Sequence, residues 1–223
     1  MTCRPPDYPD AFLQYLSLND PTLNIAPYHE RGWCFTEMCM SNLVKSSSLV
    51  LDLGYLPETV AGLGEIVDAC TKGTGRLPPL TPGDFKEILY TKRFTSIKAD
   101  SKLVNEMYMR AFMQRLGGKE VLDYQSLGWG DAEVIHLAKA LVYAAKVNEI
   151  FLQRNPAIDD AGVYAIAEVL QDARVAPNLR HVWLGIDTAS AKAKKALEDV
   201  LVERRQRNKL HGLVALSPRL PPE

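Results

Sequence analysis

The segment Tyr28-His-Glu-Arg-Gly-Trp-Cys-Phe-Thr-Glu37 brings together the side chains of this chain that are best suited to chemistry. Arg31 supplies a cation, Trp33 a large ring and Glu37 a carboxylate. The pattern from Gly32 to Lys45 predicts a helix, which places Glu37 one turn after Trp33 on the apolar side. We therefore expect the Glu37 carboxylate to be partly buried.

Residues 33–37 read Trp-Cys-x-x-Glu, and the strand-like run Leu49-Val-Leu-Asp-Leu53 follows the predicted helix. This resembles a segment of Toll/interleukin-1 receptor (TIR) domains. Residues 31–37 also resemble the Arg-x-Trp-x-x-x-Glu element of fungal heterokaryon-incompatibility domains. The resemblance spans residues 28–53 and implies that Glu37 would act on the ribose of NAD, where a carboxylate stabilises an oxocarbenium-like transition state.

A structural role for the same residues remains open. The residues before Arg31 are not rich in strand formers, and no glycine-rich phosphate loop precedes the motif. Trp33 could then anchor its helix to the core, with Glu37 paired to a donor at the core's edge. We expect this non-catalytic alternative rather than an enzyme that uses Arg31, Trp33 and Glu37.

Cysteine usage predicts a reduced, cytoplasmic chain without metal or cofactor. No cysteine pair has Cys-x-x-Cys spacing, and the N-terminus lacks the layout of a signal peptide. His29 lies near Cys34 and Cys39, but no fourth ligand stands at a recognisable spacing. No apolar run approaches the ~20 residues that span a bilayer, so a membrane is not expected.

The formal net charge of −1 gives the chain no general attraction to nucleic acid or anionic lipid. Residues 180–219 are locally basic, with nine Lys/Arg against four Asp/Glu. We interpret this as a solvated terminal helix whose cations suit its C-terminal end, because no aromatic platform for nucleic acid accompanies them. Nucleic acid is therefore not an expected partner.

The first 118 residues are predicted to be rich in helix. Patterns of apolar residues, caps and breakers favour helices over residues 32–45, 57–72, 84–92 and, from a cap at Asp100 or Ser101, to residue 116. The strand-like run 49–53 is the exception. Gly117 and Gly118 end the last helix and mark a domain boundary.

A repeat dominates the C-terminal part. Gly130-Asp-Ala-Glu-Val-Ile-His-Leu-Ala-Lys-Ala-Leu141 aligns without a gap on Asp159-Asp-Ala-Gly-Val-Tyr-Ala-Ile-Ala-Glu-Val-Leu170, and Asp187-Thr-Ala-Ser-Ala-Lys-Ala-Lys-Lys-Ala-Leu197 follows. Strand-like runs Val147-x-x-Ile150-x-Leu152 and Leu179-x-x-Val182-x-Leu184 precede the last two. A βα unit that recurs about every 29 residues is typical of a solenoid, and the final helix is expected to run to about Lys209 and cap it.

The units resemble leucine-rich repeats of the ribonuclease-inhibitor type, with the pattern Leu-x-x-Leu-x-Leu-x-x-Asn. Asn155 stands on the asparagine position three residues after Leu152, and Asp187 stands on it three residues after Leu184. In that family the side chain bonds the backbone where strand turns into loop. Ordinary βα layering with a chance period is the alternative.

Side chains of a strand alternate between its two faces, which predicts a binding surface. If Ile150, Leu152, Val182 and Leu184 point inward, Phe151 and Trp183 lie side by side on the outer face. Glu149, Gln153 and His181 would frame them. Exposed aromatic residues on adjacent strands are typical of a contact patch, although another segment could cover them.

We therefore expect an α/β chain whose helix-rich N-terminal segment (1–118) is followed by a short parallel leucine-rich-repeat array (119–210) and a tail (211–223). The expected function is protein binding through the strand face, in a signalling or immune-type assembly as the resemblance implies. A NAD- or nucleotide-processing domain that uses Glu37, and a structural piece of a longer chain, are the alternatives. The sequence predicts neither the partner nor the oligomeric state.

Overall fold

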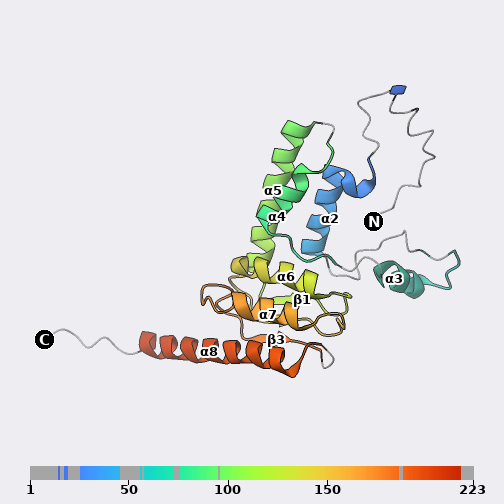
Figure 1. Ribbon diagram of the computed structural model, residues 1–223. Helices are drawn as coiled ribbons and strands as arrows, with labels where there is room; N and C mark the ends of the chain where they lie inside the picture. The colour runs from blue at the N-terminus through green and yellow to red at the C-terminus, as the bar shows by residue number, and fades with distance from the viewer. Residues whose placement is uncertain are drawn as a thin grey trace. The chain divides into compact units, whose positions relative to one another are not determined.

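The computed structural model describes residues 15, 18–19, 26–45, 56, 58–72, 76–94, 96–185 and 188–216 (Figure 1). The chain divides into two compact units, Met1–Gly118 and Lys119–Glu223, and each is described by itself. The strand predicted at 49–53 and the repeat position at Asp187 both lie outside the described residues.

The N-terminal unit is helical in its described part. Its elements are the 3-10 helix η1 (Tyr28–Glu30) and the α-helices α2 (Gly32–Val44), α3 (Leu63–Lys72), α4 (Pro82–Tyr90) and α5 (Ile97–Gly118). Helices α2, α4 and α5 share an aromatic core. The ring of Phe85 on α4 stacks on Phe35 of α2 at 5.4 Å and on Tyr108 of α5 at 3.8 Å between centroids. Tyr108 also donates its hydroxyl hydrogen to the carbonyl of Leu80 at 2.8 Å, which satisfies its one polar atom in the core.

Helices α3 and α5 begin at other residues than their candidate N-terminal residues predicted. Helix α3 begins at Leu63 and not at Pro57, since the carboxylate of Glu65 accepts the backbone N–H of residue 61 at 2.7 Å and so caps the later start. Helix α5 begins at Ile97, which leaves Ser101 buried inside its second turn rather than at its cap. In both cases tertiary packing and local capping outweigh the most obvious cap residue.

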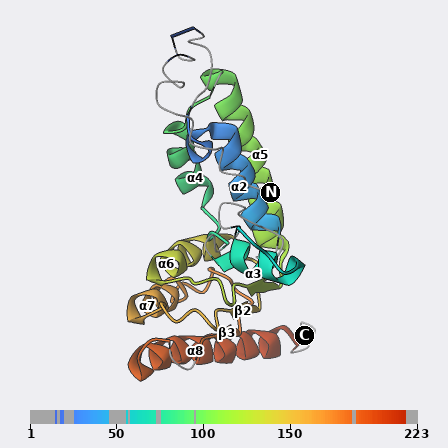
Figure 2. The same ribbon diagram turned by 90° about the vertical axis from the view of Figure 1, so that its right-hand side faces the viewer.

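The C-terminal unit alternates short strands with helices. In order it contains β1 (Val121–Asp123), α6 (Asp131–Ala140), η4 (Leu141–Tyr143), β2 (Glu149–Phe151), α7 (Asp160–Val169), β3 (His181–Trp183) and α8 (Ala191–Leu216). The strands form a parallel sheet in the order β1-β2-β3. Figure 2 shows α6, α7 and α8 stacked along one side of these strands. The prediction of an α/β chain with a small parallel sheet in this part is confirmed.

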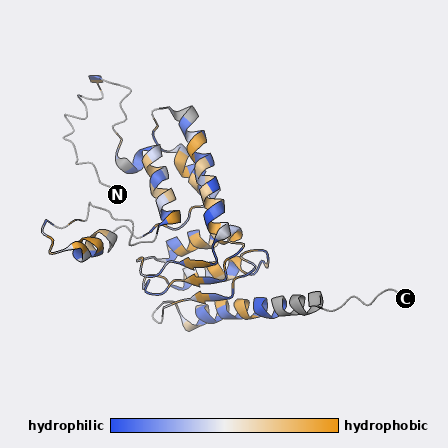
Figure 3. Cartoon of the chain, turned by 180° about the vertical axis from the view of Figure 1, so that it is seen from behind, coloured by the Kyte–Doolittle hydropathy of each residue, from blue (hydrophilic) through white to orange (hydrophobic). Residues whose placement is uncertain are grey.

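A hydrophobic core lies between the strands and the helices of this unit. The inward residues of the first two strands are fully buried, as are the facing residues of α6 and α7: Leu122, Ile150, Leu152, Val134, Leu137, Val163 and Ile166. The strands are coloured as largely hydrophobic in Figure 3, whereas α8 alternates hydrophobic and hydrophilic bands. Val182 and Leu184 were predicted to point inward in the same way. They are only half-buried, because β3 is the last strand of the described sheet.

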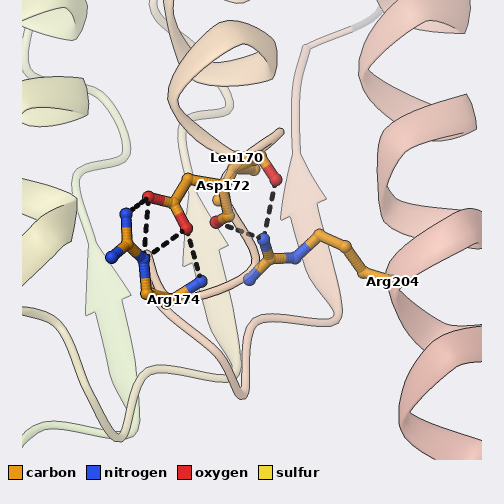
Figure 4. Close-up of polar contacts among 4 residues, drawn as sticks. All are labelled: Leu170, Asp172, Arg174 and Arg204. Atoms are coloured by element: carbon orange, nitrogen blue, oxygen red, sulfur yellow. Dashed lines mark hydrogen bonds and ion pairs between the residues drawn. The ribbon is translucent and has the colours of Figure 1, made fainter.

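The loop between α7 and β3 is held by an arginine of α8. The guanidinium of Arg204 donates to the carbonyls of Leu170 and Asp172 at 2.7 and 3.0 Å, and to those of Val175 and Ala176 at 2.6 and 2.8 Å. These carbonyls include the end of α7, where a helix leaves acceptors without intrahelical partners. Figure 4 shows the first two contacts beside the exposed Asp172–Arg174 pair. Hydrogen bonds from the Arg174 side chain lower the pKa of Asp172 to about 2.

Helix α8 begins at Ala191 and continues to Leu216, past residue 210, where a tail was expected to start. The Ser190 hydroxyl accepts the backbone N–H of Ala193 at 3.2 Å and so caps the helix. None of the helices in the described part of the chain is both long and apolar enough to cross a membrane.

Candidate functional site

The register of the parallel sheet sets which side chains share its outer face. Val121 of β1 pairs with Glu149 of β2, which pairs with His181 of β3. A second row runs in the same way from Asp123 through Phe151 to Trp183. Between the rows, Leu122 and Ile150 are buried and Val182 is half-buried, so the two rows point away from the helices. The side chains of this outer face, which we call the strand face, are Val121, Asp123, Glu149, Phe151, Gln153, His181 and Trp183.

Aromatic rings form the centre of the strand face. The rings of Phe151 and Trp183 lie 6.1 Å apart between centroids, with planes inclined by only 10°. The His181 ring lies 5.6 Å from that of Trp183, inclined by 25°. Phe151 is half-buried, whereas Trp183 leaves 44% of its surface exposed. The structure thus brings together the two aromatic residues that alternation on adjacent strands predicted, with His181 beside them.

The Glu149 carboxylate is hydrogen-bonded to this aromatic cluster. The indole Nε1–H of Trp183 donates to Oε2 of Glu149 at 3.2 Å, across the diagonal between β2 and β3. This bond joins the frame residue Glu149 to the ring that it was predicted to flank, and it satisfies the one polar atom of the tryptophan.

Gln153 and the residues of β1 complete the strand face. Gln153 is half-buried just beyond β2, and its backbone carbonyl accepts the N–H of Ser126 at 3.1 Å, which extends the sheet ladder. Val121 and Asp123 are exposed on the same two rows, but sequence reasoning did not name them. They could have been identified, because a third parallel strand in register with the other two adds one residue to each outward row of the sheet.

The motif around Arg31 forms a different surface from the one predicted. Trp33 is 39% exposed and Glu37 is exposed, so neither anchors α2 to the core. Helix α2 instead buries the side that carries Phe35, Cys39 and Leu43. Because i and i+4 share a helix face, Trp33 and Glu37 do lie together, but on the solvent side.

The start of α2 explains this orientation. Gly32 faces the core, where a Cβ atom would stand only 1.9 Å from the ring of Phe94. Its N–H donates to the carbonyl of Arg93 at 2.9 Å, and the Arg31 guanidinium donates to the carbonyl of Ala26 at 2.6 Å. With Gly32 turned inward, the residue after it is turned outward. Glu37 therefore lacks the enclosed, low-dielectric surroundings in which a carboxylate best stabilises a developing cation.

Three of the four cysteines lie among the described residues. Cys34, Cys39 and Cys70 are free thiols, and no cluster of three or more His, Cys, Asp or Glu side chains suited to a metal occurs among the described residues. Burial raises the pKa of Cys39 to about 12, and it also raises the pKa of the less buried Cys34, where Arg31 opposes the shift.

The raised pKa of Cys39 predicts that its thiol is inert in the folded chain. At pH 8 a thiol with a pKa of about 12 is thiolate in roughly one molecule in ten thousand, whereas an unfolded cysteine is about one-quarter thiolate. We expect alkylation of Cys39 by iodoacetamide, followed by peptide mass spectrometry, to be at least ~100-fold slower than in urea. Cys34 in the same sample is the reference for a partly exposed thiol. Equal labelling of Cys39 with and without urea would contradict its burial.

No family model, curated protein or solved structure matches the chain.

Proposed function

We propose that the C-terminal unit is a short leucine-rich-repeat array that binds a protein partner through the strand face. The observation that carries the proposal is the parallel pair of Phe151 and Trp183, aligned on adjacent strands and partly exposed. Large aromatic side chains in contact with water are unfavourable in isolation and are enriched at binding hot spots. Two of them held in register on a rigid sheet form a preorganised contact surface.

The surroundings of Asn155 support the repeat assignment. Its side chain is fully buried, and Oδ1 accepts the backbone N–H groups of Leu127 and Trp129 at 2.9 and 3.1 Å. Its Nδ2 donates to the carbonyls of Tyr124 and Leu152 at 2.8 and 2.9 Å. One asparagine thus satisfies backbone groups in the loop after its own strand, β2, and in the loop after the preceding strand, β1. The resemblance implies such backbone contacts for this position.

A second series of contacts connects the helices of successive units. Asp131, the first residue of α6, accepts the backbone N–H groups of Asp159 and Gly162 at the start of α7, at 2.7 and 3.0 Å. Asp160, the first residue of α7, accepts the N–H and hydroxyl of Ser190 before α8, at 2.6 and 2.8 Å. These bonds from Ser190 lower the pKa of Asp160. Equivalent carboxylates making equivalent contacts are what a stacked repeat predicts.

The same series suggests that the array ends at α8. Ala191 stands at the position of Asp131 and Asp160, so no carboxylate is available there for a further unit. The outer side of α8 is also polar, with exposed Lys192, Lys195, Glu198, Asp199 and Glu203. A polar outer face is what a terminal repeat needs.

The binding proposal is tested by removing the aromatic pair. We expect Phe151→Ala with Trp183→Ala to abolish capture of a partner from a lysate of the organism's own cells. The same change should lower the free energy of unfolding by only about 1–2 kcal/mol, since cross-strand pairs on a partly exposed face contribute little to stability. Affinity for the captured protein, once purified, is then measured by calorimetry.

A matched control removes exposed apolar surface from the helical side. Ile135 on α6 and Tyr164 on α7 are each 37% exposed. The double change Ile135→Ala with Tyr164→Ala should leave capture intact. Capture that survives the loss of Phe151 and Trp183, or that fails equally in both variants, would refute a role for the strand face. A large loss of stability in the first variant would show instead that the rings belong to the core.

A further inference from the structure

The charges of the strand face have one sign. Asp123 and Glu149 each contribute a carboxylate, and no lysine or arginine occupies either of the two outward rows that the sheet register defines. Among the described residues, the Glu149 carboxylate accepts the indole N–H of Trp183, and no basic side chain pairs with it. This acidity is local, because the chain carries 26 Lys and Arg against 27 Asp and Glu.

The rings add to the same electrostatic preference. The faces of aromatic rings carry partial negative charge, so they attract cations placed within about 6 Å of the centroid. The indole N–H bond fixes the Glu149 carboxylate at the border of the cluster of Phe151, Trp183 and His181. A planar cation that packs against an exposed ring of this cluster would also have the Glu149 carboxylate beside it.

We propose that the partner's contact with the strand face is an arginine-bearing protein segment, whose guanidinium stacks on the Phe151–Trp183 pair and binds Glu149. This inference rests on the proposed function of the strand face. Arginine fits better than lysine because its guanidinium is planar, stacks on aromatic rings and forms two parallel hydrogen bonds with a carboxylate.

The same charges argue against other classes of partner. Phosphate groups of nucleic acids or anionic lipids would be repelled by Asp123 and Glu149, and nucleic-acid interfaces require lysine and arginine that the strand face does not offer. An acidic protein segment would meet the same repulsion. A basic segment is the class whose charge complements the surface.

The test uses the full chain and three synthetic peptides of equal length. They differ only at the central residue, which is arginine, lysine or citrulline. Citrulline keeps the shape of arginine without its charge. The readout is the indole N–H signal of Trp183 in ¹⁵N-labelled protein, assigned with Trp183→Phe. We expect a saturable shift with the arginine peptide, weaker binding of the lysine peptide, and binding of the citrulline peptide reduced about tenfold or more.

Variants of the carboxylates sharpen the test. Glu149→Gln should lower the affinity for the arginine peptide about tenfold and reduce the dependence of this affinity on salt concentration. Glu168→Gln, an exposed carboxylate on α7 away from the strand face, is the matched control and should change neither. The inference is overturned if the Trp183 signal does not respond to the arginine peptide, or if citrulline or Glu149→Gln makes no difference.

The outcomes separate this inference from the proposed function. Suppose that a captured partner is lost when Phe151 and Trp183 are removed, but binds the Glu149→Gln variant with full affinity and also binds at high salt. The strand face would then still be the binding site, and the proposed arginine contact would be refuted. A partner that is indifferent to both changes would refute both. Self-association of the chain that disappears in Glu149→Gln would replace the separate partner by a second copy.

Discussion

Replacing Asn155 with alanine should destabilise the C-terminal unit by about 4 kcal/mol, in the range for loss of a buried hydrogen-bond network. The side chain is fully buried and bonds five backbone groups of the loops that follow β1 and β2. Alanine removes these partners without opening space that water can readily fill, and each buried group left unsatisfied costs roughly 1–3 kcal/mol. Urea denaturation followed by circular dichroism measures the change.

Two further variants test this explanation. Asn155→Asp keeps an acceptor for Leu127 and Trp129 but sets a carboxylate against the carbonyls of Tyr124 and Leu152, so it should also destabilise strongly. Asn178 is the matched control, because its Nδ2 donates to the carbonyl of Ala145 at 2.8 Å but is exposed. Asn178→Ala should cost less than about 1 kcal/mol. Similar effects of the two alanine substitutions would contradict a special role for Asn155.

The alternation of strand and helix in the C-terminal unit could be predicted because its periodicity is local. The strand-like runs Val147-x-x-Ile150-x-Leu152 and Leu179-x-x-Val182-x-Leu184 indicate β2 and β3, and an acidic residue marks the start of α6 and α7. Alternation then places Phe151 and Trp183 together without further information. The strand face follows from the register alone.

The strands are less evenly spaced in the sequence than a repeat of about 29 residues predicts, and this has a structural cause. Glu149 pairs with Val121 on one side and with His181 on the other, so successive strands are 28 and then 32 residues apart. The longer second interval passes through the loop that ends α7, whose carbonyls Arg204 binds. An irregular spacing in sequence therefore does not require an irregular sheet, because the loop absorbs the added residues.

The orientation of α2 could not be predicted, because both of its sides carry apolar residues. Trp33 and Val44 on one side compete with Phe35, Cys39 and Leu43 on the other, and hydrophobicity alone does not decide between the two sides. The structure favours the second side because Gly32 allows the ring of Phe94 to approach the helix start. Such a contact depends on a residue 62 positions later, which no local pattern reports.

Arg204 shows the same limit for charge. In the sequence it belongs to a basic run that predicts a solvated helix, yet only 5% of the residue is exposed. Its neighbours Arg205 and Arg207 do behave as surface cations and pair with Glu198 and Glu203. A basic run therefore does not tell which of its members turns toward the carbonyls of a neighbouring loop.

Arg204→Ala should lower the free energy of unfolding by about 3–4 kcal/mol, close to the effect of Asn155→Ala. The change removes the Arg204 donors from the carbonyls of Leu170 and Val175 and opens space beneath α8. The carbonyl of Ala176 loses one of its two donors and keeps the backbone N–H of Leu179. Burial lowers the pKa of Arg204, but arginine starts above about 12 and stays protonated at neutral pH. The charge therefore remains available to bind these carbonyls throughout the neutral range.

Two further substitutions test whether the geometry or the charge of the Arg204 guanidinium stabilises the loop between α7 and β3. Arg204→Lys keeps the charge but lacks the planar fork that reaches carbonyls on both sides, so it should recover less than half of the lost stability. Arg205→Ala removes an adjacent exposed cation that pairs with Glu198, and should cost less than about 1 kcal/mol. If Arg204→Ala were as mild as Arg205→Ala, the loop between α7 and β3 would not depend on Arg204. If Arg204→Lys restored full stability, the charge alone would suffice, and the fork geometry would not explain why an arginine stands there.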